Sequence, residues 1–203
     1  MEQLDFYQLI KTRIQQSIEI KSKLMHDIGI IAETAKLIIE AYRNGKKVIL
    51  FGNGGSAADA QHIAAELAGK YYMDRTPLPA EALTVNTSTL TAIGNDYGFE
   101  QIFARQVEAL GTPGDIAIGI STSGNSPNVI EGIRVAKKKG MITIGLTGAE
   151  GGQLKNEVDY CICVPSKDTP RIQEAHILIG HIWCELIERA LFGDEREEGV
   201  VTP

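Results

Sequence analysis

The 203-residue sequence has only three cysteines, no excess of basic residues and no long hydrophobic run. A helix that spans a membrane needs roughly 20 consecutive apolar residues, and no stretch of the sequence approaches that length. The first five residues, MEQLD, lack the basic start and the apolar core of a secretory signal peptide. These absences argue against a membrane protein and predict a cytoplasmic location.

The cysteines, Cys161, Cys163 and Cys184, are odd in number and show no Cys-x-x-Cys spacing. Cys161 and Cys163 alternate within a predicted strand, so their side chains should point to the same face. This pattern is typical of small core residues rather than of a redox or metal-binding pair. A reducing cytoplasm agrees with this interpretation.

The sequence carries 26 acidic and 20 basic residues, a formal net charge of −6. This balance argues against a general nucleic-acid or membrane surface, and we expect neither partner. A local site could still bind a small anion through backbone and hydroxyl donors. The length and a hydrophobic fraction of 43% fit one domain. We predict that domain over residues 1–192, followed by an acidic, mobile tail over 193–203.

Strands and helices alternate along the chain from residue 47 onward. The predicted strands are 47–51, 80–84, 115–120, 141–146 and 159–164. The predicted helices are 57–69, 88–93, 100–110, 127–139 and 170–192. Such alternation indicates an α/β fold, a five-stranded parallel sheet with helices on both faces. We expect the flavodoxin-like strand order 2-1-3-4-5.

Two further helices, 3–25 and 27–44, are predicted ahead of the first strand. The long N-terminal helix has little to bury itself against within one sheet. It packs either on a neighbouring subunit or on its own domain, and the sequence leaves both possibilities open.

A glycine-rich turn, Gly52-Asn53-Gly54-Gly55-Ser56, follows the first predicted strand and opens a helix. Free backbone N–H groups at a helix start can bind an anion, and glycines let the backbone come close to it. The turn matches neither a P-loop, which closes with Lys-Ser or Lys-Thr, nor a clean G-x-G-x-x-G fingerprint. An anion site and a simple tight connection are both compatible with it.

A second turn, Ser121-Thr122-Ser123-Gly124-Asn125-Ser126-Pro127, follows the third predicted strand. It places four hydroxyl groups within six residues, whereas an ordinary helix N-cap needs one. The excess favours a hydrogen-bonding cup. Because the first and third strands are neighbours in the expected order, both turns border the crevice where ligands bind in such sheets.

Four side chains on two predicted helices are candidates for chemistry. His62 and Glu66 are four residues apart and share one helix face. Gln173 and His181 are eight apart, about 80° around the helix axis. Together they could hold a zinc ion or carry out acid–base chemistry. Taken singly, a His–Glu pair is more often a solvated surface pair, and a histidine beside apolar residues is more often part of a core.

Four segments together resemble the phosphoheptose isomerases, a branch of the sugar isomerase (SIS) family. They are the glycine-rich turn Gly52-Asn53-Gly54-Gly55-Ser56, Gly94-Asn95-Asp96-Tyr97-Gly98-Phe99, Gly119-Ile120-Ser121-Thr122-Ser123-Gly124-Asn125-Ser126, which contains the serine-rich turn, and Arg171-Ile172-Gln173-Glu174. From spacing alone, Asn95-Asp96 is an ordinary polar turn. The resemblance extends over nearly the whole chain, to about Phe192. The serine-rich turn marks the broad family, whereas Glu66 and His181 mark its catalytic branch.

The resemblance implies a role for each matching residue. Glu66 is the expected catalytic base and His181 its acid–base partner. Substrate contacts are expected from Asn53, Gly54, Gly55, Ser56, Glu66, Asn95, Asp96, Ser121, Thr122, Ser123, Ser126 and Gln173. One Zn²⁺ per subunit is expected on His62, Glu66, Gln173 and His181, although glutamine is a poor zinc ligand. The resemblance also implies a homotetramer with active sites near subunit interfaces.

We therefore expect an aldose–ketose isomerase that converts D-sedoheptulose 7-phosphate to D-glycero-D-manno-heptose 7-phosphate through an enediol. This would be the first step toward the heptose of cell-surface glycans. Two alternatives stay open: a non-catalytic SIS protein that binds a replication initiator, and an SIS isomerase or sensor of another sugar phosphate. The presence of both Glu66 and His181 favours an enzyme, whereas the two turns recognise phosphate and leave the sugar undetermined.

Overall fold

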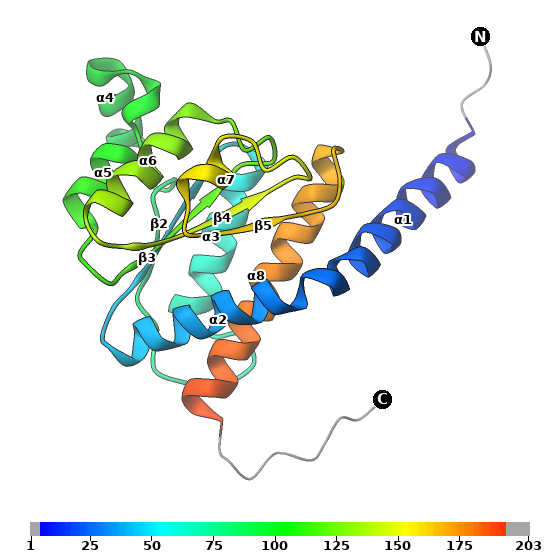
Figure 1. The fold of residues 1–203 in the computed structure, drawn as a ribbon, viewed down its shortest axis with the longest axis horizontal. Coiled ribbons are helices and arrows are strands. Elements are labelled where there is room, and N and C mark those ends of the chain that lie inside the picture. The colour runs from blue at the N-terminus through cyan, green and yellow to red at the C-terminus, as the bar shows by residue number, and fades with distance from the viewer. Residues whose placement is uncertain (1–4, 194–203) are drawn as a thin grey trace.

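The computed structural model describes residues 5–193 and contains one parallel sheet (Figure 1). Its strands are β1 (Val48–Gly52), β2 (Ala80–Ala82), β3 (Ile116–Ile120), β4 (Ile142–Thr147) and β5 (Tyr160–Cys163). They lie in the order β2-β1-β3-β4-β5, and each neighbouring pair is parallel. The predicted five-stranded sheet and its strand order are confirmed.

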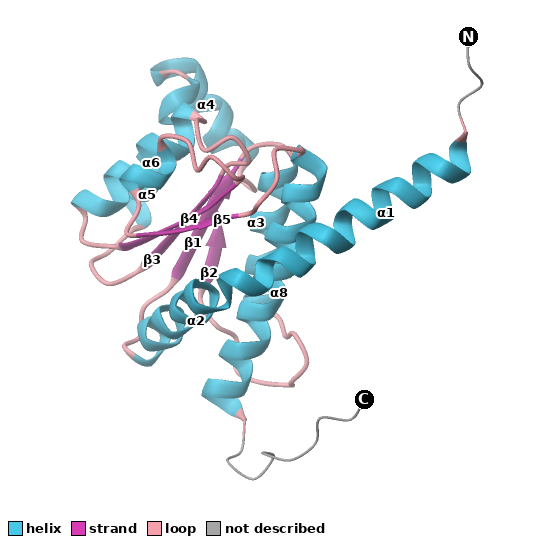
Figure 2. Ribbon diagram, turned by 45° about the vertical axis from the view of Figure 1, so that its right-hand side comes forward, coloured by secondary structure: helices cyan, strands magenta, loops and turns pink. Residues whose placement is uncertain are grey.

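Helices cover both faces of the sheet (Figure 2). The α-helices are α1 (Phe6–Lys23), α2 (Ile28–Arg43), α3 (Gly55–Ala68), α4 (Thr87–Tyr97), α5 (Ala104–Leu110), α6 (Pro127–Lys138), α7 (Leu154–Glu157) and α8 (Thr169–Phe192). Two 3-10 helices, η1 (Leu24–Asp27) and η2 (Phe99–Gln101), join α1 to α2 and α4 to α5. Helices α2, α3 and α8 pack on one face, and α5, α6 and α7 pack on the other.

The alternation of side chains along β1 explains the two helical layers. Val48 and Leu50 point into the hydrophobic cluster under α2, α3 and α8, whereas Ile49 and Phe51 point into the cluster under α5 and α6. All five residues of β1 are buried, as expected for a central parallel strand that is covered on both faces. Each large apolar side chain buried there contributes about 1.5–3 kcal/mol to the stability of the fold. Strand β1 therefore fixes the position of the turn that follows it.

Helix α1 extends away from the body of the molecule (Figure 1). None of its 18 residues, all of which the structure describes, is buried. Phe6, Tyr7, Ile10 and Ile14 expose large apolar side chains to solvent. Packing of this helix on its own domain is therefore wrong for most of its length, and packing on a neighbouring subunit stays a prediction.

Helix α4 is longer than predicted. Its start is capped by Asn86, whose Oδ1 accepts a hydrogen bond from the N–H of Thr89 at 3.0 Å. Its end coincides with Gly98, which has a φ of +89°, a conformation that glycine adopts at little cost. Asn95 and Asp96 therefore lie in the last turn of a helix. Their placement in a polar turn was wrong.

The carboxyl ends of β1 and β3 lie side by side, because Gly52 is paired with Ile120. The glycine-rich turn after β1 and the serine-rich turn after β3 therefore leave the sheet at adjacent points. The two turns therefore flank the point where the strand order predicts a ligand-binding crevice.

The division into one domain over 1–192 and a tail over 193–203 stays a prediction, and residues 194–203 lie outside the described part of the chain. Within residues 5–193, no helix is both long and apolar enough to cross a membrane. Helix α7 was not predicted, because its four residues are too few to reveal a helical period.

Candidate active site

The glycine-rich turn brings the backbone close to its neighbours. A Cβ atom at Gly52 would lie 2.8 Å from the main-chain oxygen of Ile120 and 2.8 Å from the Cβ of the buried Ser56, so no larger residue fits. Gly54 has a φ of +55°, which is strained for residues with a side chain. Helix α3 begins directly afterwards at Gly55, two residues before the predicted start. Its positive dipole end therefore lies at the crevice.

The hydroxyl groups of the serine-rich turn are not used to start α6. Ser126 occupies the N-cap position ahead of Pro127, but within the described chain its side chain makes no capping hydrogen bond. Instead, Ser126 Oγ lies 2.9 Å from Ser121 Oγ. The hydroxyl of Ser123 accepts a hydrogen bond from the N–H of Asn125 at 3.1 Å. These contacts support the interpretation of the turn as a hydrogen-bonding cup.

A polar cavity of about 230 Å³ opens beside the serine-rich turn. Thr122 and Ser123 line it, together with Ser166 and Lys167 from the segment before α8. Lys167 Nζ lies 2.5 Å from Oε1 of Glu150, which also lines the cavity and offsets part of the lysine charge. The groups that the cavity offers to an anion are therefore mainly hydroxyls.

A reciprocal pair of side-chain amides joins the two turns. Asn53 Nδ2 donates to Asn128 Oδ1, and Asn128 Nδ2 donates to Asn53 Oδ1, both at 2.8 Å. Asn128 is buried at the start of α6, and its Oδ1 also accepts from the N–H of Val129 at 3.0 Å. The pair fixes the position of Asn53, one of the predicted substrate contacts.

Helices α3 and α8 bring a carboxylate and two imidazoles together. On α3, His62 Nε2 lies 3.2 Å from Glu66 Oε1. On α8, His181 Nε2 lies 3.3 Å from His62 Nε2, and the ring of Tyr71 lies 5.6 Å from the His181 ring. The side chain of His62 is 46% exposed and that of Glu66 is 26% exposed. The three residues thus form an accessible cluster, so His181 is not a core histidine and His62–Glu66 is more than a surface pair.

The donor atoms of this cluster fit a metal ion. One ligand atom from each of His62, Glu66 and His181 lies within 4.8 Å of the other two. A tetrahedral zinc ion with bonds of about 2.0–2.2 Å separates its ligand atoms by roughly 3.4 Å. The separations of 3.2 and 3.3 Å agree with that value. Imidazole nitrogens and a carboxylate oxygen are also donors that zinc prefers.

Gln173, the fourth predicted metal ligand, contacts the glycine-rich turn. Its side-chain amide packs against Gly55 in the first turn of α3, whereas His62 and Glu66 lie about two and three turns later on that helix. This contact brings Gln173 to the predicted substrate-binding residues. Its role as a metal ligand stays a prediction.

The contacts of a single chain do not bring Asn95 and Asp96 to the crevice. Both side chains are exposed at the end of α4, and Asn95 Nδ2 donates to Asp96 Oδ1 at 2.8 Å. Within the described residues, neither side chain has a hydrogen bond to a predicted site residue outside this pair. Their role as substrate contacts stays a prediction.

Asp59 is a further polar residue at the site, and the sequence pattern did not indicate it. It lies one turn before His62 on α3, and its buried Oδ2 has no hydrogen-bond partner in the described part of the chain. Burial raises the pKa of its carboxyl group to about 6, against an opposing effect of His62. Because Asp59 is three residues from His62, both side chains lie on one face of the helix. This spacing could have indicated Asp59 from the sequence.

Cys161 and Cys163 on β5 are partly rather than fully buried, and Cys161 packs against the hydrophobic cluster under α5 and α6, so the prediction of core residues holds only in part. They do share one face of the strand, because their Sγ atoms lie 3.7 Å apart. The reason for their exposure is that β5 is an edge strand of the sheet, where cover by the helices is incomplete.

The arrangement supports two kinds of chemistry. The glycine-rich and serine-rich turns offer hydroxyls and a helix start to an anion such as a phosphate group. The half-buried carboxylate of Glu66, next to two imidazoles, can remove a proton from carbon and move protons between oxygens.

The chain is similar to known proteins over most of its length. The model of the SIS domain family matches residues 14–148. A phosphoheptose isomerase from Aneurinibacillus thermoaerophilus is 56% identical over 186 residues, which cover 90% of this chain and 94% of that protein. The structures of phosphoheptose isomerases from Neisseria gonorrhoeae and Francisella tularensis superpose with TM-scores of 0.86 and 0.89, at 43% and 40% identity. The superposition with the first structure covers 91% of this chain and 99% of the other, and that with the second covers 92% and 100%.

Proposed function

Because this chain belongs to the SIS family and, within it, to the phosphoheptose isomerases, we propose that it interconverts D-sedoheptulose 7-phosphate and D-glycero-D-manno-heptose 7-phosphate. One observation carries the proposal. Glu66 from α3 and His181 from α8 meet across His62, at 3.2 and 3.3 Å. A ketose–aldose isomerase needs such a carboxylate and imidazole beside the same substrate.

The proposed reaction moves one proton between two carbons. Glu66 takes a proton from C1 of the ketose, which gives an enediol, and returns it to C2. His181 moves a proton from O1 to O2, so that the carbonyl group passes from C2 to C1. Each step is a proton transfer, and the atoms and charges of the substrate balance at the end.

The two turns would hold the phosphate group. Ser121, Thr122, Ser123 and Ser126 offer hydroxyls, and the start of α3 at Gly55 offers the positive end of a helix dipole. Binding energy from the phosphate, which lies far from C1 and C2, can orient the reacting carbons for proton transfer.

Zinc is the metal that we propose for the cluster of His62, Glu66 and His181, with Gln173 as the predicted fourth ligand. When bound, zinc would polarise the substrate carbonyl as a Lewis acid. A carboxylate that binds zinc is a weaker base, so the two predicted roles of Glu66 compete with each other.

A homotetramer would account for two features of the single chain. The apolar side chains of α1 are exposed, and burial against other subunits would remove them from water. Asn95 and Asp96 bond only to each other among the predicted site residues of the described chain, and a neighbouring subunit could receive them. Subunits that share active sites in this way, in a cytoplasmic enzyme, form part of the proposal.

The experiment that tests the function is isomerisation of sedoheptulose 7-phosphate in heavy water, followed by NMR. We expect an aldose heptose phosphate with deuterium incorporated at C2, because a base that carries the proton exchanges it with solvent. Loss of turnover after chelation, with recovery on addition of zinc, would support the metal assignment. Absence of product with and without zinc would contradict the proposed reaction.

The variant Glu66→Gln tests the base. It keeps the size of the side chain but cannot take a proton, so turnover should fall at least about a thousandfold while binding of the sugar phosphate persists. Turnover close to that of the unaltered protein would show that Glu66 is not the base.

The same assay addresses the two alternatives. A hexose or hexosamine phosphate that is isomerised faster than the heptulose phosphate would favour another substrate. Saturable sugar phosphate binding without any isomerisation would favour a protein that binds a partner such as a replication initiator. The presence of both Glu66 and His181, and the identity to named isomerases, support the enzyme.

A further inference from the structure

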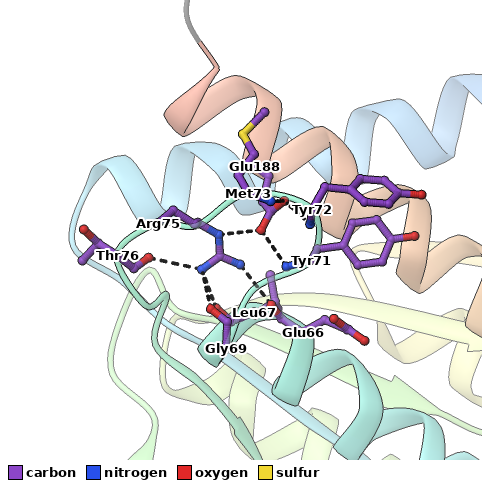
Figure 3. Close-up of polar contacts among 9 residues, drawn as sticks. All are labelled: Glu66, Leu67, Gly69, Tyr71, Tyr72, Met73, Arg75, Thr76 and Glu188. Carbon is purple, nitrogen blue, oxygen red and sulfur yellow. Dashed lines mark hydrogen bonds and ion pairs between the residues drawn. The ribbon is translucent and has the colours of Figure 1, made fainter. Parts of the chain in front are cut away.

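A buried carboxylate holds the loop that follows α3 (Figure 3). Glu188, on α8, accepts hydrogen bonds from three consecutive main-chain N–H groups, those of Tyr71, Tyr72 and Met73, at 2.8, 2.8 and 3.0 Å. It also accepts one from Arg75 Nε at 2.8 Å. Successive N–H groups that converge in this way form an anion-binding nest. The loop over residues 69–76 is therefore shaped around a side chain from another helix.

The guanidinium of Arg75 binds the end of α3 on its other side (Figure 3). Its Nη2 donates to the main-chain oxygen of Glu66 at 3.0 Å. Its Nη1 donates to the main-chain oxygen of Leu67 at 2.9 Å and reaches that of Thr76 at 3.2 Å. A cation at the carboxyl end of a helix is favourable, because it satisfies carbonyl groups that have no partner within the helix.

The Arg75–Glu188 pair is completely enclosed, since each side chain is 1% exposed. Burial alone would raise the pKa of Glu188, but the N–H groups of the nest and Arg75 outweigh this and hold the pKa below its ordinary value. A buried ion pair is weak evidence for a role in stability, because apolar residues of similar size often serve as well. The pair instead defines geometry, because the guanidinium of Arg75 is a planar donor with several N–H groups in fixed directions.

The pair touches both helices of the candidate active site. Arg75 binds the main chain of Glu66 itself. Glu188 lies seven residues after His181, two turns along the same face of α8. The nest also presents Tyr71, whose ring lies against His181. One set of hydrogen bonds thus links the backbone of the proposed base to the helix of its proposed partner.

We propose that Arg75 and Glu188 are positioning residues that set the separation of the Glu66 carboxylate from the His181 imidazole. This inference rests on the proposed isomerase function. It assigns the pair a role in turnover that neither the family match nor the metal cluster requires.

The test compares two matched variants, Glu188→Gln and Asp115→Asn. Asp115 is also 1% exposed, and it accepts hydrogen bonds from the N–H groups of Lys47 and Thr112 and from Lys47 Nζ, at 3.1, 2.9 and 2.6 Å. It precedes β3 at the amino edge of the sheet, away from the crevice. Both substitutions place an amide NH₂ against N–H donors, so both should lower the melting temperature.

We expect kcat of Glu188→Gln to fall at least tenfold with KM within threefold of the unaltered protein. Asp115→Asn should keep kcat within threefold when each protein is assayed equally far below its own melting temperature. Equal kcat values for the two variants would overturn the proposal. If Glu188→Gln does not fold, Arg75→Lys replaces it, because lysine keeps the charge but cannot bind Glu188 and the Glu66 carbonyl together.

A second readout does not depend on turnover. The imidazole NMR signals of His62 and His181, in protein labelled at histidine, should shift in Glu188→Gln and stay in place in Asp115→Asn. Unshifted signals in Glu188→Gln would overturn the positioning role. If the unaltered protein does not isomerise sedoheptulose 7-phosphate, the proposed function fails, and the histidine signals still decide whether the pair positions the two side chains.

Discussion

Gly55 and the side-chain amide of Gln173 lie so close together that a side chain at position 55 would have to displace Gln173. A Cβ atom there would lie 2.8 Å from Cδ and 2.9 Å from Oε1 of Gln173. Gly55 is not among the glycines with a positive φ, so its backbone would accept alanine. The glycine is therefore required for the space that it leaves to Gln173.

The variant Gly55→Ala should displace Gln173 without unfolding the protein. We expect kcat/KM to fall at least about tenfold, whereas the free energy of unfolding should change by no more than about 1 kcal/mol, since alanine favours a helix. Gly29→Ala on α2 is the control, because a Cβ there meets nothing within 4 Å. Steady-state kinetics and urea unfolding check both. Unchanged kcat/KM in Gly55→Ala would show that Gln173 has no role in the active site.

Ser126→Ala should weaken substrate binding and leave the stability of the protein nearly unchanged. Its hydroxyl contacts Ser121 Oγ rather than capping α6 in the described chain, so we expect KM to rise about tenfold with little effect on the free energy of unfolding. Asn86→Ala should behave in the opposite way. It removes a real N-cap from α4 and should cost about 1 kcal/mol. A Michaelis constant unaffected by Ser126→Ala would contradict the hydroxyl cup.

His176 should make the protein sensitive to mild acid. It is fully buried on α8, and its Nε2 donates to the main-chain oxygen of Thr147 at 3.1 Å. Burial lowers its pKa from 6.5 to about 4. As the pH falls, the unfolded chain therefore binds a proton at His176 before the folded protein does. The contribution of His176 to the free energy of unfolding is fully present above pH 6.5 and is lost as the pH falls toward 4.

Between pH 7 and pH 5 this effect amounts to about 2 kcal/mol. Urea unfolding at the two pH values should show that the change in the free energy of unfolding differs by about that amount between the unaltered protein and His176→Gln, which keeps a donor for Thr147. The comparison cancels the opposite contribution of Asp59, whose carboxyl pKa is raised in the folded protein. His26→Gln, at an exposed position in η1, should keep the full pH dependence. An equal loss in His176→Gln would show that other groups cause it.

Cys163 should react with iodoacetamide well before Cys184. A hydrogen bond from Cys161 lowers the pKa of Cys163 below that of an ordinary thiol, whereas burial raises the pKa of Cys184 to about 12. The thiolate is the reactive form, so Cys163 should still be labelled at a pH where an ordinary thiol has become unreactive. Peptide mass spectrometry after brief labelling at pH 7.5 measures both sites.

Two variants of Cys161 test whether its hydrogen bond causes the reactivity of Cys163. Cys161→Ser keeps a donor beside Cys163 and should retain the low labelling midpoint, whereas Cys161→Ala should raise the midpoint toward that of an ordinary thiol. Labelling of Cys184 as fast as Cys163 in the folded protein would contradict the burial of Cys184.

The strands and both turns were predictable from the sequence, because each rests on local patterns, whereas the strand order came from the general rule for sheets in which strands and helices alternate. Apolar runs indicated the strands, and hydroxyls and glycines marked the turns after them. The meeting of His62 and Glu66 followed from helical spacing. Their approach to His181 came from the family resemblance, since 119 residues separate His62 from His181.

Features that depend on distant contacts were not predictable. Arg75 and Glu188 are 113 residues apart, and neither has a local pattern that distinguishes it from a surface charge. The exposure of Cys161 and Cys163 depends on how completely helices cover an edge strand, which alternation along that strand does not reveal. Asn95 and Asp96 looked like a turn because asparagine and aspartate before glycine favour one, but the cap at Asn86 and the stop at Gly98 extended the helix across them.

The amide pair of Asn53 and Asn128 also constrains how the sequence can change. Each side chain both donates to and accepts from the other across 75 residues of chain, so replacing one leaves a donor or an acceptor of the other without its partner. The effects of two single substitutions should therefore not add in a double-mutant cycle. A substitution at either position should therefore require a compensating substitution at the other, so that positions 53 and 128 are expected to vary together.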